Sequence, residues 1–484
     1  DRSHPPMGEL RWEYETFKYL GVQIYHAEKD LTDGNIQRTM RSMRGSMRFW
    51  LSLPLSPMGR VSLCKMLLLP RLLYFFSALP LMLPKKLFKD MHCMLGELIW
   101  GNNRHRIGLA KLHSPITEGG MGVPNLELYY AAAQLQWPTQ WLAVPPSPEI
   151  TYIQHTTLPT RNNVYAWLTS SRKVTRYESC LLTTARKTWC RYVMDNTNQH
   201  PYSPLLPLAF IPRISGVMQT HDISGWIEKG IDEIRDLYQE GALMSFLEIS
   251  EAYSIPMAHF LKYTAVREAI MRQWEGGPSE PPVSPVLHAV LSHGTAKKTV
   301  SSIYIALQTM ATPPYTDIQK RWDTDLTTPL TDTQWSQALC HVKKVSRNMR
   351  LRYTQINYLH RTYLTPHRVA KMYTGVGANC PRCRHHRADF IHMVWSCPII
   401  ATAWQAIVKT VEEVVESPTP FNPESCLLGV RTTTKQNKCK NKLLGLAFAL
   451  FKRLIAMHWK AQTAPKIETW LKILLKWAQA ESDF

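Results

Sequence analysis

Acidic residues are scarce in this chain, and one long segment contains none. The 484 residues include 37 Asp and Glu against 57 Lys and Arg, which gives a formal net charge of +20. From Thr333 to Ala388, a stretch of 56 residues has no Asp or Glu but has eleven Lys or Arg. Such an excess of positive charge favours a polyanionic partner, either nucleic acid or an acidic membrane surface.

Cysteine is sparse as well. Ten cysteines are scattered through the 484 residues, so they do not form the dense framework of a small disulfide-stabilised protein. We therefore expect a reducing compartment, cytoplasmic or nuclear or both. Apolar residues make up 45% of the chain and aromatic residues 10%, which excludes a wholly disordered protein.

Long uninterrupted apolar runs are also missing. The most apolar stretch, residues 67–83, contains Arg71 and prolines at positions 70 and 80. A membrane-spanning helix needs about 20 apolar residues without such interruptions, so we interpret the stretch as a core helix and expect no membrane partner. The chain begins at Asp1 without a basic and then apolar leader, so we expect no secretory signal and a start within a longer sequence.

Hydrophobic periodicity predicts a mainly α fold with a short β hairpin near the amino terminus. Residues 8–25 are rich in aromatic and β-branched side chains, and Gly21 marks a bulge or a close backbone approach. Apolar side chains at 36, 40, 43, 47 and 50 define one face of a helix, opposite Arg38, Arg41, Arg44 and Arg48. Further helices are predicted over residues 59–79 (kinked at Pro70), 84–100, 125–141, 399–416, 441–460 and 466–480. Proline-rich stretches at 144–148, 200–212 and 276–285 predict boundaries or linkers.

Four residues of metal-binding type lie within 18 positions, in the pattern Cys380-x2-Cys383-x8-His392-x4-Cys397. Three thiols and one imidazole match the tetrahedral ligand set that zinc prefers, and four protein ligands leave no open position for catalysis. We therefore predict a structural zinc site. His385 or His386 could replace His392. The alternative without a metal is four unrelated residues, two of them buried thiols.

The segment without acids predicts a nucleic-acid-binding surface. Lys and Arg neutralise phosphates, and Tyr353, Tyr358 and Tyr363 supply rings on which unpaired bases can stack. The alternative is a solvated charged face, which explains the arginines at 38–48 about as well. The basic residues of the segment are Lys343, Lys344, Arg347, Arg350, Arg352, Arg361, Arg368, Lys371, Arg382, Arg384 and Arg387.

Two further patterns are interpreted as structural. Asp323-Thr324-Asp325 resembles a metal-binding acid pair of sugar transferases, but we expect no catalytic role for it. Gly119-Gly120-x-Gly122 lacks the following Lys-Ser or Lys-Thr of a phosphate loop, so a tight turn is predicted.

Several short motifs together point to one family. They are Phe17-Lys18-Tyr19-Leu20-Gly21-Val22-Gln23-Ile24, Gly59-Arg60-Val61-Ser62-Leu63-Cys64-Lys65-Met66 with Leu69-Pro70-Arg71, Gly119-Gly120-Met121-Gly122-Val123-Pro124 leading to Leu128-Tyr129-Tyr130, Tyr363-Leu364-Thr365-Pro366-His367-Arg368, the Cys/His cluster continuing to Trp404, and Phe421-Asn422-Pro423 with Leu427-Leu428-Gly429. In this order, and across nearly the whole chain, they resemble the carboxy-terminal half of the reverse transcriptase of LINE-type non-LTR retrotransposons. Only the Cys/His set is specific by itself, and the order of the motifs makes the resemblance strong.

The resemblance implies four domains. Residues 1–28 would be the last hairpin of the polymerase palm, with Tyr19 and Gly21 close to the primer end. Residues 29–142 would be a helical thumb that grips the template–primer duplex, with the arginines at 38–48 and the helix from Gly59 facing phosphates. Residues 143–286 would be a helical connector that ends in the proline-rich linker, and residues 287–484 the zinc-binding domain that contacts RNA.

The resemblance also implies what this chain does not carry. The family places its catalytic carboxylates in the palm, upstream of residues 17–24, where they hold two metal ions. No two Asp residues are adjacent in this chain. We therefore expect no catalytic residue and no polymerase or nuclease activity from it alone, with magnesium needed only by the full-length enzyme of the family.

The expected role is to hold RNA, an RNA–DNA hybrid or a DNA duplex. Two alternatives are a domesticated host protein that binds RNA or DNA without catalysis, and a decayed fragment without function. What is encoded directly upstream of this sequence would separate the expected role from these two alternatives. The preference for RNA or DNA and the oligomeric state stay open.

Overall fold

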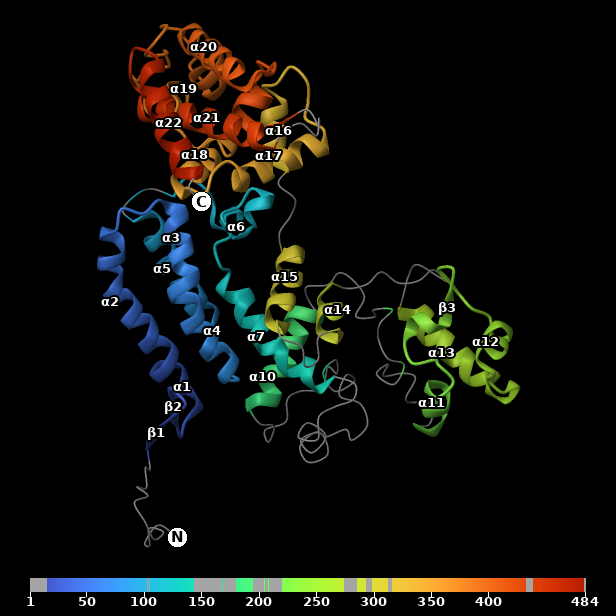
Figure 1. Ribbon diagram of the computed structural model, residues 1–484. Coiled ribbons are helices and arrows are strands. Elements are labelled where there is room, and N and C mark those ends of the chain that lie inside the picture. Colours follow the sequence, from blue (N-terminus) through green and yellow to red (C-terminus); the bar gives the residue numbers. More distant parts are fainter. Residues whose placement is uncertain are drawn as a thin grey trace. The chain divides into compact units, whose positions relative to one another are not determined.

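The computed structural model describes residues 15–101, 103, 105–142, 168, 180–194, 204, 208, 220–273, 285–292, 298–311, 316–431 and 438–482 (Figure 1). The chain divides into two compact units, each built from segments that are discontinuous in the sequence. The first unit comprises residues 1–42, 69–91 and 125–312. The second comprises residues 43–68, 92–124 and 313–484.

The predicted fold class is confirmed, because the described residues are mainly helical and their strands form two short antiparallel hairpins (Figure 1). The hairpins pair β1 (Thr16–Tyr19) with β2 (Val22–Tyr25), and β3 (Tyr238–Gln239) with β4 (Ala242–Leu243). The helices are α1 (Glu28–Leu31), α2 (Arg38–Ser52), α3 (Pro57–Leu63), α4 (Leu69–Ala78), α5 (Lys85–Trp100), α6 (Leu109–His113), α7 (Leu126–Trp141), α10 (Cys180–Trp189), α11 (Thr220–Ile227), α12 (Phe246–Tyr253), α13 (Phe260–Gln273), α14 (Pro285–Leu291), α15 (Thr299–Ala311), α16 (Thr316–Asp323), α17 (Asp332–Lys344), α18 (Met349–Leu359), α19 (Pro366–Met372), α20 (Pro398–Val415), α21 (Lys438–Met457) and α22 (Ile467–Ser482).

The first hairpin turns through two residues with positive φ, Leu20 at 45° and Gly21 at 84°. Such a turn matches the twist of paired strands, and glycine adopts it without steric cost. The Asn35 amide accepts from the backbone N–H of Gln23 at 2.8 Å and donates to its carbonyl at 2.7 Å, which anchors β2. The extended segment is thus confirmed over residues 16–25, whereas residues 8–14 lie outside the described part of the chain.

The two faces of α2 are as predicted. Met40, Met43, Met47 and Trp50 are buried, and Ile36 in the preceding π-helical turn is buried with them. All four arginines of the opposite face are exposed. Residues three or four positions apart share one side of a helix, so the apolar spacing alone decides which side faces the core.

Helices α3 and α4 continue one another through a π-helical turn, Cys64–Leu68. Pro70 cannot donate a helical hydrogen bond, and the extra residue of a π turn is a common way to accommodate such a break. The predicted irregularity at Pro70 therefore takes the form of a π turn just before it. By length and composition, residues 57–78 are also apolar enough to cross a membrane, a test that the core helix of a soluble protein passes as well. One third of the most apolar window is buried.

In the first unit, α7 packs against α4, α10, α14 and α15 (Figure 1). The rings of Tyr129 and Tyr304 stack with centroids 3.7 Å apart. The buried side chain of Gln134 donates to the carbonyl oxygen of Phe76 at 2.6 Å, which joins α7 to α4. These contacts explain why α7 is apolar around most of its surface and is buried along most of its length.

In the second unit, α18 lies against α3, α17 and α21. The buried Tyr358 hydroxyl donates to the carbonyl oxygen of Lys452 at 2.9 Å, and the Trp322 indole donates to that of Leu359 at 2.9 Å. The glycine-rich turn packs on the same unit: a Cβ at Gly120 would collide with the Ser114 carbonyl, and Gly119 has φ of 85°. The tight turn predicted at residues 119–122 is confirmed.

Several predictions fall on residues that are not described. They are the boundary at 144–148, most of the stretch 200–212, and residues 276–284 of the linker. The four predicted domains stay a prediction.

Candidate metal centre and candidate nucleic-acid interface

The four predicted ligands lie together in the second unit. The candidate ligand atoms of Cys380, Cys383, His392 and Cys397 are all within 4.8 Å of one another. The Sγ atoms of Cys380 and Cys397 are 3.9 Å apart, and Sγ of Cys383 is 3.3 Å from Nε2 of His392. Cys380 and Cys397 are fully buried and His392 is nearly so. The cluster could hold a metal ion with four protein ligands.

The first two ligands are placed by a tight backbone turn. The N–H of Cys380 donates to the carbonyl of His385 at 2.8 Å, and the N–H of Arg384 donates back to the carbonyl of Cys380 at 3.0 Å. Arg384 has φ of 64°, which lets the chain reverse between these bonds. The turn holds both sulfurs on one side, as the Cys-x2-Cys spacing predicts.

The other two candidate ligands, His392 and Cys397, lie just before α20. Asp389 Oδ1 accepts from the N–H of His392 at 2.9 Å, and the N–H of Cys397 donates to the carbonyl of His392 at 3.0 Å. Cys397 is the N-cap residue of α20, followed by Pro398 at the first helical position. The Trp404 indole donates to the carbonyl of Val394 at 2.9 Å and so fixes the π-helical turn His392–Ser396 against α20.

Of the three candidate histidines, His392 is the one that lies beside the three cysteines. Only His392 belongs to the cluster of four among the described residues. His385 and His386 are exposed, and the His385 ring stacks on that of His392 with centroids 4.6 Å apart. His385 thus covers the candidate ligand His392 from outside.

The thiols of the cluster differ in acidity. Burial raises the pKa of Cys397 to about 11, although the N–H groups of Ile400 and Ile399 counteract it. Burial also acts to raise the pKa of Cys383, but hydrogen bonds from the His385 N–H and from the neighbouring thiols together lower it. Metals bind thiolates, so loading of the cluster would release protons.

The prediction of a nucleic-acid contact is wrong for Arg382. Its side chain is buried, with 6% exposure, inside the turn that carries the first two cysteines. The guanidinium donates to the carbonyls of Met393 at 3.1 Å and His458 at 3.2 Å. Arg382 therefore joins the metal-binding turn to the end of α21 and cannot reach a phosphate.

Most other basic residues of the predicted interface are exposed. Lys343 and Lys344 end α17, Arg347 lies in the connection to α18, and Arg350 lies in the first turn of α18. The N–H of Arg350 is capped by Asn348 Oδ1 at 2.8 Å. The exposed members are Lys343, Lys344, Arg347, Arg350, Arg368, Lys371, Arg384 and Arg387.

Three residues of this segment have their side chains turned inward. Arg361 is 15% exposed and pairs with Asp325, so the predicted contact is wrong for it too. Arg352 is half-buried and donates through Nε to the carbonyl of Ser346 at 2.6 Å. Tyr358 is completely buried, so it cannot stack on a base, whereas Tyr353 and Tyr363 are half-buried.

Tyr19 and Gly21, the predicted contacts of the hairpin, belong to the first unit. Tyr19 is 62% exposed, and the Tyr74 hydroxyl donates to the carbonyl of Leu20 beside it. Gly21 lines a hollow of about 450 Å³ together with Arg71 and Tyr74. The hairpin turn therefore presents an aromatic ring and a nearby cation to solvent.

The aspartates of the Asp323-Thr324-Asp325 pattern have structural partners. Asp323 Oδ1 accepts from the N–H of Leu330 at 2.9 Å, and Asp325 pairs with Arg361. Both carboxylates stabilise the loop between α16 and α17, in agreement with the structural interpretation.

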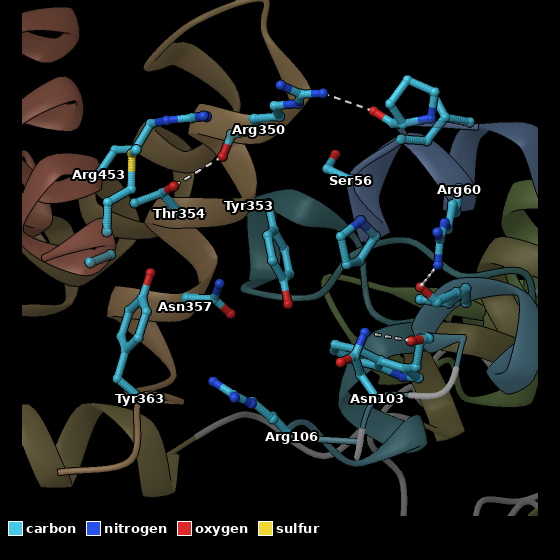
Figure 2. Close-up of a pocket in the computed structure, with 17 residues that line it drawn as sticks. Ser56, Arg60, Asn103, Arg106, Arg350, Tyr353, Thr354, Asn357, Tyr363 and Arg453 are labelled. Carbon is cyan, nitrogen blue, oxygen red and sulfur yellow. Dashed lines mark hydrogen bonds between the residues drawn. The ribbon is translucent and has the colours of Figure 1, made fainter. Parts of the chain in front are cut away.

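Sequence reasoning missed a pocket that gathers arginines from distant segments. Arg106, Arg350 and Arg453 line it together with Tyr353 and Tyr363 (Figure 2). Arg106 and Arg453 follow no local motif, and only the folded chain brings them beside α18. The signal available in the sequence was limited to Arg350 and the two tyrosines.

No protein-family model matches this chain. Function is therefore inferred from the metal cluster and the basic surface.

Proposed function

We propose that this chain is a nucleic-acid-binding part of a LINE-type reverse transcriptase, which holds RNA or a template–primer duplex. A structural zinc ion stabilises the region that carries the basic surface. In this proposal the chain binds and positions the nucleic acid. The catalytic carboxylates of such an enzyme belong to its palm. The expected partners are RNA, an RNA–DNA hybrid or a DNA duplex, in the cytoplasm or the nucleus.

One observation carries the proposal. Lys343, Lys344, Arg347 and Arg350 are all exposed at the junction of α17 and α18. No acidic residue occurs in the sequence between Thr333 and Ala388. A folded domain that concentrates cations in this way, with aromatic side chains close by, attracts a polyanion that carries bases.

Zinc is the metal that suits the cluster best. Three sulfurs and one imidazole nitrogen are a common ligand set of structural zinc sites. Tetrahedral zinc would place two sulfurs about 3.8 Å apart, and a sulfur and a nitrogen about 3.6 Å apart. The separations of 3.9 Å for Cys380 and Cys397 and 3.3 Å for Cys383 and His392 agree with this geometry. Because four protein ligands leave no open position, the metal would support the fold.

The test is the salt dependence of RNA binding by the whole chain. Replacing Lys343, Lys344 and Arg347 together by glutamine should weaken binding to a single-stranded RNA about tenfold or more near physiological salt. The slope of log affinity against log salt should become shallower by about 2, because each lost phosphate contact contributes about 0.7 for single strands.

A matched control removes the same charge elsewhere. Lys409 on α20 and Lys472 and Lys476 on α22 are exposed, and their triple glutamine variant should keep nearly the wild-type slope. If both triple variants lose affinity equally, only net charge matters and the α17–α18 surface is not the interface. If the wild-type chain binds no nucleic acid, the proposal itself is wrong.

A further inference from the structure

A pocket in the second unit has the features of a binding site. Its volume is about 640 Å³, within the range of small-molecule sites. All of its lining residues belong to the second unit (Figure 2). They come from the start of α3 and the residues just before it, from the end of α5 and the segment after it, from α18 and Tyr363 beyond it, and from the end of α21. Four separate segments thus converge on one space.

The pocket is strongly positive. Four arginines line it, Arg60, Arg106, Arg350 and Arg453, and none of the described lining residues is Asp or Glu. Arg60 donates to the carbonyls of Leu51 at 3.3 Å and Ile99 at 3.5 Å, so it belongs to the wall. A carbonyl contact satisfies a donor but leaves the positive charge without a counterion.

The arginines also repel one another. Burial lowers the pKa of Arg453, and the positive charge of Arg350 lowers it further. Arg350 donates to the carbonyl of Pro54 at 2.9 Å, which holds it at the rim. Arg106 is exposed and forms no ion pair with a described carboxylate. Like charges held close together in one hollow are stabilised when an anion binds among them.

Aromatic and amide groups complete the lining. In Figure 2, Tyr353, Asn357, Tyr363 and Arg106 project into the same space. The Tyr363 ring stacks on Trp459 with centroids 5.0 Å apart, which fixes it in place. The Asn357 side chain accepts from the Thr362 hydroxyl at 2.9 Å, which fixes the amide in place. The half-buried Tyr353 ring lines the pocket and is suited to stack on a flat base.

We propose that this pocket binds one unpaired nucleotide of an RNA strand. Arg106, Arg350 and Arg453 contact its phosphate groups, and Tyr353 stacks on its base. The inference rests on the proposed function and adds to it the place where the strand is held in an unpaired form. A binder of free phosphate would need the arginines alone, whereas the Tyr353 ring in the lining and the size of the pocket suit a nucleotide.

The first test removes charge from the pocket. The probe is a fluorescein-labelled twelve-nucleotide oligouridylate, titrated against the full chain at several salt concentrations. The variant Arg106→Gln/Arg453→Gln should bind about tenfold more weakly, and its salt slope should be shallower by about 1.4 for two lost contacts. The control Lys409→Gln/Lys476→Gln removes equal charge from exposed positions outside the pocket and should stay close to wild type.

The second test removes the ring and keeps the charge. Tyr353→Leu should weaken oligouridylate binding about tenfold, whereas Tyr353→Phe should retain it, because stacking needs the ring and not the hydroxyl. Inorganic phosphate competes for the arginines only. It should therefore displace the oligonucleotide from wild type and from Tyr353→Leu to the same extent. Preferential displacement by uridine monophosphate from wild type supports the nucleotide site.

The outcomes separate the pocket from the wider proposal. If the pocket variants bind like the Lys409/Lys476 control while wild type binds RNA, the pocket inference is overturned and the basic surface stands. If wild type binds no RNA, both are overturned. The single variant Arg106→Gln is a safeguard in case the double variant misfolds, because this exposed side chain makes no described hydrogen bond. This single substitution should still weaken RNA binding several-fold.

Discussion

The guanidinium of Arg361 lies over the indole ring of Trp322, with its central carbon 4.3 Å from the ring centroid. The same guanidinium pairs with Asp325, and Trp322 is fully buried. A cation on an aromatic face gains electrostatic attraction, and removing one partner of a shielded ion pair leaves the other charge uncompensated. Arg361 therefore joins the end of α18 to the end of α16.

We predict that Arg361→Gln lowers the free energy of unfolding by about 2 kcal/mol, a value between those of exposed and fully buried ion pairs. The loss arises because Asp325 keeps its charge without a partner. Urea denaturation measures it. Arg384→Gln, an exposed neighbour of the metal cluster, should change stability by less than about 0.5 kcal/mol. An Arg361 variant with wild-type stability and weakened RNA binding would contradict the structural role.

The residues that sequence reasoning placed correctly depend on local spacing. The faces of α2 follow from apolar residues three or four positions apart, and the metal cluster follows from 18 consecutive positions. Arg361 and Arg382 were misassigned because the partners that bury them are remote in sequence. Asp325 precedes Arg361 by 36 residues, and the His458 carbonyl follows Arg382 by 76. The arginine pocket could not be predicted for the same reason.

The metal cluster yields a prediction about composition and stability. Purified protein should contain about one zinc ion per chain, measured by elemental analysis. Cys380→Ser should lower that content and the melting temperature, because the metal-binding free energy contributes to folding. Cys93→Ser, at an exposed position outside the cluster, should change neither. Wild-type zinc content in Cys380→Ser would show that the metal binds elsewhere.

Lys452 makes stability depend on pH. Its side chain is completely buried, and its Nζ donates to the Leu427 carbonyl at 2.9 Å and to Gln355 Oε1. Burial lowers its pKa to about 7, with Cys426 opposing the shift and Arg431 adding to it. In the unfolded chain the pKa returns to about 10.5.

Between these two pKa values the unfolded chain binds a proton that the folded chain does not. Stability contributed by this group therefore rises as the pH increases from about 7 toward 10. We predict that the free energy of unfolding of wild type increases by roughly 1–2 kcal/mol more between pH 7 and pH 9 than that of Lys452→Met. Urea denaturation at each pH measures it. The exposed control Lys460→Met should follow the wild-type curve, and a parallel curve for Lys452→Met would refute the assignment.

The exposed face of α2 yields a prediction about duplex binding. Arg41, Arg44 and Arg48 repeat at helical spacing on the side opposite the buried methionines. Successive cations along one helix face can follow the phosphates of a duplex, and each contact contributes about 0.9 to the salt slope. The triple glutamine variant should therefore bind an RNA–DNA hybrid with a slope shallower by about 2 to 3. Arginine and glutamine have similar helix propensities, so the melting temperature should hardly change.

The matched control for α2 is the triple variant Lys85→Gln/Lys86→Gln/Lys89→Gln on α5, where all three lysines are exposed. It removes the same charge from a helix of which no individual residue is predicted to contact nucleic acid. The comparison distinguishes a solvated charged face from a binding face. Substitutions on a solvated face change the salt slope only through net charge, so both triple variants would then change it equally. Equal slopes for the two triple variants would assign the α2 arginines to solvent, whereas a shallower slope for the α2 variant alone would assign them to the duplex.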